Sequence, residues 1–371
     1  MDRNLAGAHL SIDLGALQEN YRTLSYRANS AACAASVKAD AYGLGIEAVG
    51  PALYAAGCRR FFVALPEEGI TLRALLPEAQ IHVLAGVLPE TEAAYLDHRL
   101  DPVLNSPEDI VRWTAVAKTR GERLTALLHV DTGMTRLGLS EAEIRALADD
   151  PGGLDMLDIT AVMSHLACGD QPDHPMNAAQ RARLLQLRAL LPSAAGKAPL
   201  SLANSAGVFL GPAYHFDIVR PGIALFGGNP QSGRPNPMRE VVRLRARILQ
   251  LRDVDSEIPV GYGATYRTAK PSRIATVSVG YADGYLRALG NRAEGAVKGI
   301  RVPVIGRVSM DMITIDVSEA PADACRPGDF IDLIGGAIPL DEVAERAGTI
   351  SYEILTSLGR RYYRDYVSAT D

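Results

Sequence analysis

The chain has 371 residues, of which 47% are hydrophobic and 22% are charged; this is typical of a folded protein with a large and a smaller domain, and excludes a disordered chain. The net charge of −5 and the lack of Lys or Arg blocks argue against nucleic-acid binding, and no apolar run approaches the ~18 residues of a membrane helix. The N-terminal stretch lacks the apolar core of a signal peptide and the four cysteines lack metal-ligand spacing, so we expect a cytoplasmic protein with reduced thiols, no metal and no membrane partner.

The first two-thirds of the chain alternates between short apolar runs and helix-like stretches. The helix-like stretches include residues 45–57, 66–77, 106–121 and 177–192, and the third begins with a good N-cap at Ser106. The apolar runs cover residues 34–37, 61–65, 81–86, 102–105, 124–133, 159–167, 200–205 and 216–227. Eight such runs predict an N-terminal (β/α)₈ TIM-like barrel within an α/β protein. A doubly wound open sheet is the alternative, weakened because no G-x-G-x-x-G follows any run.

The pattern changes near residue 235. Residues 227–237 (GGNPQSGRPNP) read as a linker or long loop. Alternating runs without long helices follow at 241–254, 273–280, 300–308, 313–317 and 329–335, with two short helices expected near the end. We therefore expect a barrel over residues 1–235 and a predominantly β domain over 236–371, with packing of the first few residues against the second domain as the alternative.

Polar residues stand where the apolar runs of the barrel end. Taken singly, each has an ordinary explanation: Lys38 could reach solvent or a carboxylate, His165 could be a core histidine, Arg136 a surface ion-pair partner and Arg220 a strand-end cap. In a barrel, however, the carboxyl ends of all strands meet at one mouth. The sequence therefore predicts one amine, two guanidiniums and an imidazole facing an anionic ligand.

The loops after the last two strands add a phosphate signal. Residues 203–207 (ANSAG) and 220–228 (RPGIALFGG) are rich in glycine and small residues, whose backbone N–H groups can approach an anion. Barrels often bind phosphate with these two loops. A lysine able to form a Schiff base beside a phosphate site points to pyridoxal 5′-phosphate (PLP).

A series of motifs spans Lys38 to Leu358 in order: AASVKADAYGLG, HVDTGMTRLGL, MSHLACGD, LANSAG, DIVRPGIALFG, VGYGATYRT, VGYADGY, IGRVSMDM and SYEILTSL. In these motifs the chain resembles the alanine racemase family, PLP-dependent enzymes with a barrel and a C-terminal β domain. The resemblance implies interconversion of L- and D-alanine by two bases, supplying D-alanine for bacterial peptidoglycan. A racemase of serine, lysine or a broader range of amino acids would share these residues, and a non-catalytic PLP carrier is a remote alternative because that class lacks a β domain.

The resemblance also implies roles for individual residues. Lys38 and Tyr266 would be the two opposed bases, with Lys38 also binding PLP covalently, and Arg220 and His165 would complete the catalytic set. The substrate would meet Arg136, Met310, Tyr266 and, at its entrance, Tyr285. Members of the family are homodimers in which Tyr266 and Met310 enter the partner's site. The residues expected to contact PLP are Lys38, Tyr42, Arg136, His165, Asn204, Ser205, Arg220, Gly222, Ile223 and Tyr352.

Two positions bear on the chemistry more specifically. Arginine keeps its proton at working pH, so Arg220 would leave the pyridine nitrogen of PLP unprotonated, which favours racemisation over decarboxylation. His129 is a departure, because many members of the family have a carbamylated lysine there that orients the arginine at position 136. His129 could hold Arg136 through a neutral nitrogen or a bound anion, or be a plain core residue.

Overall fold

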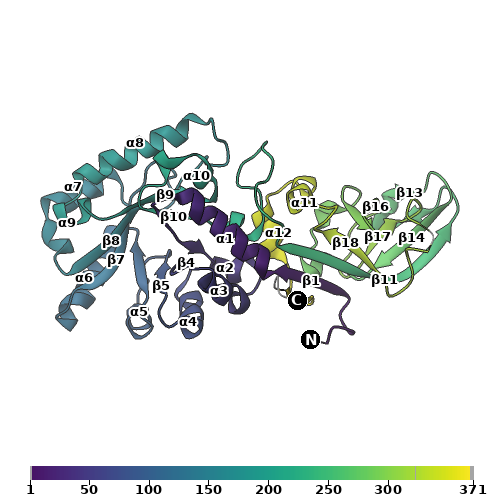
Figure 1. Cartoon of the computed structure of the whole chain (residues 1–371), viewed down its shortest axis with the longest axis horizontal. Coiled ribbons are helices and arrows are strands. Elements are labelled where there is room, and N and C mark those ends of the chain that lie inside the picture. Colours follow the sequence, from purple (N-terminus) through teal and green to yellow (C-terminus); the bar gives the residue numbers. More distant parts are fainter. Residues whose placement is uncertain (1, 322, 368–371) are drawn as a thin grey trace.

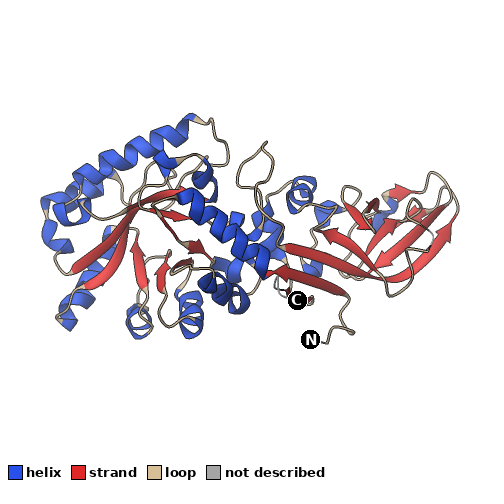
Figure 2. Cartoon of the chain, in the orientation of Figure 1, coloured by secondary structure: helices blue, strands red, loops and turns tan. Residues whose placement is uncertain are grey.

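The computed structural model describes residues 2–321 and 323–367. It consists of a helix-covered barrel and a second part dominated by strands (Figures 1 and 2). No helix of the described ranges is long and apolar enough to cross a bilayer.

The strands of the barrel are all parallel and close into a ring. β2 (Ala32–Cys33) and β3 (Ala35–Ser36) are the two halves of one strand, and they pair with β10 and β4 respectively. The other strands are β4 (Arg60–Val63), β5 (Gln80–Val83), β6 (Asp101–Leu104), β7 (Leu124–His129), β8 (Leu157–Met163), β9 (Leu200–Asn204) and β10 (Ile218–Arg220). Each pairs with the next in sequence order. This closure confirms the predicted (β/α)₈ barrel and excludes the doubly wound sheet.

Helices cover the outside of the ring. The four predicted helical stretches correspond to α3 (Ile46–Ala55), α4 (Pro66–Leu75), α6 (Pro107–Arg120) and α8 (Pro175–Leu190). The Ser106 hydroxyl accepts a hydrogen bond from the backbone of Asp109 at 3.2 Å, as the N-cap prediction requires. The remaining helices of the barrel are α2 (Lys38–Tyr42), α5 (Glu92–Asp97), α7 (Glu141–Asp149), α9 (Ser193–Gly196) and α10 (Ser205–Phe209).

The last strand of the barrel is not followed by an α-helix. Only a short 3₁₀ turn, η3 (Ile223–Phe226), follows β10, and the unpredicted helix α1 (Leu14–Ala28) lies beside it. The Asn20 side chain of α1 donates to the carbonyl of Leu225 at 3.2 Å. Helix α1, which precedes the first barrel strand β2, therefore covers this side of the barrel.

Further 3₁₀ turns of the chain are η1 (Pro151–Leu154), η2 (Pro212–Tyr214), η4 (Tyr262–Ala264), η5 (Tyr281–Asp283) and η6 (Arg287–Leu289).

The second part is built around one long strand, β11 (Val242–Val254), whose first half buries every second residue. β11 pairs antiparallel with β18, β14 and the N-terminal strand β1. The other elements are β1 (Ala8–Asp13), β12 (Pro259–Val260), β13 (Tyr266–Arg267), β14 (Ser272–Val277), β15 (Glu294–Val297), β16 (Ile300–Ile305), β17 (Ile313–Asp316), β18 (Phe330–Ile334), β19 (Tyr363–Val367), α11 (Leu340–Ala347) and α12 (Ser351–Ser357). This confirms a predominantly β C-terminal domain with two short helices.

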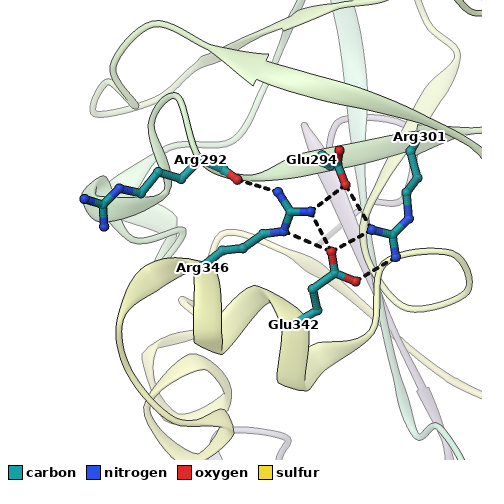
Figure 3. A network of polar contacts seen from close by, with 5 residues as sticks. All are labelled: Arg292, Glu294, Arg301, Glu342 and Arg346. Carbon is teal, nitrogen blue, oxygen red and sulfur yellow. Dashed lines mark hydrogen bonds and ion pairs between the residues drawn. The ribbon is translucent and has the colours of Figure 1, made fainter.

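An ion-pair network fastens α11 to the strands of this domain (Figure 3). Both carboxylate oxygens of Glu342 accept hydrogen bonds from Arg301 at 2.6 Å, and Arg346 donates to Glu342 at 2.9 Å and to Glu294 at 2.8 Å. The carbonyl of Arg292 accepts from Arg346 at 2.7 Å. These contacts with Arg301, and secondarily with Arg346, lower the pKa of Glu342.

Glu342→Gln is expected to destabilise this domain by about 0.5–1 kcal/mol at pH 7, because the network is partly exposed to solvent. Folding lowers the pKa of this carboxyl, so the carboxylate stabilises the folded protein at pH values above its unfolded pKa of about 4.3. That stabilisation is lost as the pH falls through the pKa of the folded state. The melting temperatures of wild type and variant should therefore differ at pH 7 and approach each other as the pH falls below about 4.3. A gap that does not narrow at all in acid would contradict this account.

Candidate functional site

A cavity of about 300 Å³ opens at the carboxyl ends of the barrel strands. Its lining includes ten of the residues that the sequence singled out: Lys38, Tyr42, His129, Arg136, His165, Asn204, Ser205, Arg220, Gly222 and Tyr352. Ser36, Phe62, Leu84 and Met163 complete much of the remaining wall, and the sequence analysis did not name them. The strand ends thus meet at one mouth, as the barrel geometry requires.

Lys38 and Tyr42 reach the cavity from the two ends of α2, which has unusual backbone geometry. Ala39, Asp40 and Ala41 have φ values of 55°, 53° and 55°, and Tyr42 has 56°. The segment is therefore a left-handed turn built without glycine. Lys38 is half-buried, and burial, followed by the charge of Arg136, lowers its pKa. A lysine with a lowered pKa is a better nucleophile and base near neutrality.

Arg220 is a buried cation with no carboxylate beside it among the described side chains. Its guanidinium donates to the Ser201 hydroxyl and, at 2.6 Å, to the carbonyl of Ser164. Burial lowers the pKa of Arg220 to about 10, so the group stays charged at neutral pH. A buried, charged donor at a cavity wall is suited to an acceptor atom of a ligand.

His165 lies between Arg220 and Asn204. Its Nδ1 is 3.4 Å from the Arg220 guanidinium and its Nε2 is 3.4 Å from the Asn204 amide nitrogen. The Asn204 amide is oriented by Gly207, whose N–H donates to Oδ1 at 3.0 Å. Both ring nitrogens therefore face donors, and burial together with the charges of Arg220 and Arg136 holds the pKa of His165 well below its usual value. The imidazole is neutral at pH 7.

His129 is a cavity-wall residue with a defined partner rather than a plain core residue. Its Nδ1 lies 2.8 Å from Oδ1 of Asn105, whose amide nitrogen donates to the carbonyls of Leu84 and Val103, both at 3.0 Å. Asn105 is thereby oriented as the acceptor, so Nδ1 of His129 carries the hydrogen. Burial, followed by the charges of Arg220 and Arg136, lowers the pKa of His129 to about 4. His129 cannot supply the negative charge of a carbamylated lysine.

At one end of the cavity, side-chain hydroxyls lie close to the backbone around Gly222. The Ser205 hydroxyl accepts from the N–H groups of Gly222 at 2.8 Å and Ala224 at 3.2 Å. The ring of Tyr42 packs between those of Phe226 and Tyr352, at centroid distances of 4.8 and 5.8 Å. A Cβ atom at Gly222 would lie 2.0 Å from the Tyr42 hydroxyl. Only glycine leaves room for that hydroxyl against the backbone.

Gly222→Ala is therefore expected to lower the free energy of unfolding by about 1–3 kcal/mol, the usual result of overpacking. Tyr42 is buried and its ring packs against those of Phe226 and Tyr352, so moving its hydroxyl aside would disturb these contacts. The loss should appear as a lower melting temperature of the variant. Gly211→Ala would not serve as a control, because Gly211 has a φ of 103°, which disfavours a side chain. Gly152→Ala, where the nearest atom would be 3.4 Å away, should change stability little. Equal melting temperatures of Gly222→Ala and Gly152→Ala would contradict the packing argument.

Four of the predicted site residues lie outside the cavity lining of this chain. Ile223 is buried directly behind Gly222 in η3. Tyr266 is in β13, which lies at the end of the β domain remote from the barrel (Figure 1). Met310 is 53% exposed, and Tyr285 is buried in the same domain. One chain alone does not bring these three residues to Lys38.

The fold and the cavity are those of a (β/α)₈-barrel protein in which a lysine, two arginines and two histidines line one cavity at the mouth of the barrel. Comparison with known families is more specific: residues 12–230 match the model of the alanine racemase N-terminal domain, and residues 241–366 match that of the alanine racemase C-terminal domain. The chain belongs to the alanine racemase family.

Individual relatives agree over nearly the full length. Alanine racemase of Rhodospirillum rubrum is 52% identical over 363 residues, covering 97% of this chain and 96% of that protein. Agrobacterium fabrum has two relatives at 47% identity, one named catabolic (98% of this chain, 92% of that protein) and one named biosynthetic (99% and 95%). The structure of alanine racemase from Bartonella henselae with covalently bound pyridoxal phosphate has a TM-score of 0.93 at 41% identity, covering 98% of this chain and all of that one.

Proposed function

We propose that this chain is an alanine racemase that uses PLP held by Lys38, acts as a homodimer with shared sites, and supplies D-alanine for peptidoglycan in the cytoplasm. The carrying observation is the cavity itself, which combines a lysine of lowered pKa with a buried arginine that has no carboxylate partner among the described residues. Membership of the family supports alanine as the substrate. The proposed domains are residues 1–235 and 236–371, with the first strand, β1, pairing with β11 and β19 of the second domain.

The lining residues fit PLP. Lys38 offers the amine, and Arg220 offers a charged donor for the ring nitrogen. The hydroxyls of Tyr42, Ser205 and Tyr352 with the amide groups of Gly222 and Ile223 would hold the phosphate, the Gly222 N–H exchanging its present acceptor, the Ser205 hydroxyl, for a phosphate oxygen. The space that a Cβ at Gly222 would fill is taken by the Tyr42 hydroxyl, as such a cradle requires. When bound, PLP supplies an electron-withdrawing ring that makes the α-hydrogen of an attached amino acid acidic.

The protein's own groups would then move that proton. Lys38 can accept a proton on one face of the α-carbon, because burial and Arg136 lower its pKa. A tyrosine on the other face ordinarily titrates at about pH 10, so it needs cations nearby to act as a base. Arg136 and Arg220 are available cations at the mouth, whereas the neutral His165 can pass a proton or orient its neighbours. Arg136 is also free of any carboxylate among the described residues, which suits it to the substrate carboxylate.

The same geometry supports a dimer. Tyr266, Met310 and Tyr285 are proposed site residues, yet they lie in the β domain away from the cavity of their own chain. A second copy that places its β domain over the barrel mouth would complete both sites at once, which is a symmetric arrangement. Exposed apolar side chains of the β domain, those of Met310 and Met312, would be covered in such a contact.

The function is tested by incubating the purified protein with L-alanine, L-serine and L-lysine separately in D₂O. We expect loss of optical rotation together with α-deuterium uptake for alanine. Preferred turnover of serine or lysine would favour a racemase of broader range. Deuterium uptake without racemisation would indicate that only one base acts on the substrate. No reaction with any of the three amino acids would overturn the proposal in favour of a PLP carrier.

A further inference from the structure

The left-handed turn after Lys38 needs an external support. Four consecutive residues without glycine, Ala39 to Tyr42, have φ between 53° and 56°. L-residues with side chains avoid this region, and such conformations persist only where the surroundings hold them. The turn sets the distance and direction between two cavity groups, because Lys38 stands at its start and Tyr42 at its end.

Backbone hydrogen bonds hold the turn from within, since the N–H of Ala41 donates to the carbonyl of Val37 at 2.9 Å, and the side chain that supports its Lys38 end is that of Glu68. Its Oε1 accepts a hydrogen bond from the backbone N–H of Ala39, the residue directly after Lys38, at 2.6 Å. Its Oε2 accepts from the N–H groups of Ala64 at 2.6 Å and Leu65 at 3.3 Å, where β4 ends and α4 begins. One side chain therefore ties the turn to the strand and helix beside it, through charge-assisted hydrogen bonds.

The other end of the turn has separate supports. The Asp40 carboxylate accepts from the N–H of Ile46 at 2.8 Å, and Arg364 donates to the carbonyl of Gly43 at 2.7 Å.

Glu68 also acts on Lys38 through its charge. Burial and Arg136 lower the pKa of Lys38, and the nearby Glu68 carboxylate raises it. The carboxylate thus acts on Lys38 both through the backbone and through its charge.

We propose that Glu68 is a positioning residue for the cavity, holding Lys38 and Tyr42 at their spacing by anchoring the left-handed turn between them. The part of this inference that concerns PLP rests on the proposed function. The part that concerns Lys38 and Glu68 rests only on the contacts described above.

The test compares full-length wild type with Glu68→Gln. Glutamine offers one oxygen where glutamate offers two, so either Ala39 or the start of α4 loses its acceptor and faces an N–H donor instead. Glu67→Gln is the matched control, since Glu67 is the exposed neighbour on the same turn and no hydrogen bond to its carboxylate is seen among the described residues. Two quantities are measured: the dissociation constant of PLP by equilibrium ultrafiltration, and the pH dependence of Lys38 acetylation by acetic anhydride in the PLP-free chain, read by mass spectrometry.

We expect the dissociation constant of PLP to rise about tenfold or more in Glu68→Gln, the cost of a lost hydrogen bond to a charged group. The pH midpoint of Lys38 acetylation should fall, because the removed negative charge favoured the protonated amine. Glu67→Gln should match wild type in both measurements. A residue that only capped α4 would lower the melting temperature of Glu68→Gln and leave both quantities unchanged, and that result would overturn the inference.

Glu68→Asp provides a second variant if Glu68→Gln does not fold. Its charge is kept but its shorter side chain cannot span both groups of donors, so PLP should bind more weakly while the acetylation midpoint stays near that of wild type. Wild-type binding of PLP by Glu68→Asp would count against the inference. A wild-type chain that binds no PLP would overturn the proposed function instead, and the acetylation midpoints would still decide whether Glu68 acts on Lys38.

Discussion

Replacing Tyr266 by Phe is expected to slow removal of the α-proton from one enantiomer of alanine by about 10²–10⁴-fold, while removal from the other enantiomer continues. The reason is that the proposed bases work on opposite faces of the α-carbon, so each enantiomer presents its proton to only one of them. Lys38 remains in place in this variant and still serves its own face. Deuterium uptake measured separately from D- and L-alanine in D₂O gives the two rates.

Tyr262→Phe is the matched control for this experiment. Tyr262 precedes Tyr266 in the same loop and its side chain is strongly exposed, so both variants lose one hydroxyl from the same segment. We expect Tyr262→Phe to exchange both enantiomers at nearly the wild-type rate. An equal loss for both enantiomers in Tyr266→Phe would refute the two-base assignment.

Arg220→Glu is expected to slow racemisation by about 10²–10³-fold and to produce a long-wavelength absorbance when alanine is added to the PLP-loaded protein. Arg220 donates hydrogen bonds from a buried position and keeps its own proton. A glutamate there could instead share a proton with the acceptor atom that faces it and so deepen the electron withdrawal of the cofactor ring. The absorbance is followed by rapid-scanning spectroscopy, and the rate by D-alanine formation.

The substitution also has a structural cost that a control must separate. The carboxylate introduced by Arg220→Glu would face the carbonyl of Ser164, which in the wild type accepts from the guanidinium. Arg220→Lys keeps the positive charge and a donor, so it should show weakened activity without the new absorbance. If Arg220→Glu has the spectrum of wild type, the role assigned to Arg220 is wrong.

The sequence was informative about the barrel because the strands of the ring are short apolar runs, several of which stop at a polar residue. Lys38, His165 and Arg220 could be placed at one mouth from the sequence alone, since parallel strands in a ring expose all their carboxyl ends together. Helix α1 was missed although it is a regular element. Its place beside η3 depends on contacts such as that between Asn20 and Leu225, which are remote in sequence.

The supporting residues could not be predicted for the same reason. Asn105 and Glu68 look like ordinary polar residues at the end of a strand and the start of a helix. Their effect on His129 and Ala39 arises only when neighbouring βα units are side by side. The left-handed turn was also invisible, because the KADAY segment contains none of the glycines that usually mark a positive φ.

The N-terminal strand has a consequence for the order in which the chain can be assembled. β1 pairs with β11 and with β19, yet every strand of the barrel lies between β1 and those partners in the sequence. During synthesis, β1 leaves the ribosome before the barrel strands and remains without these partners until the barrel has been made and β11 follows. Contacts of such long sequence separation form late and slowly. The apolar residues of β1, among them Leu10 and Ile12, are therefore exposed on the nascent chain while the barrel is made, and need protection from premature association.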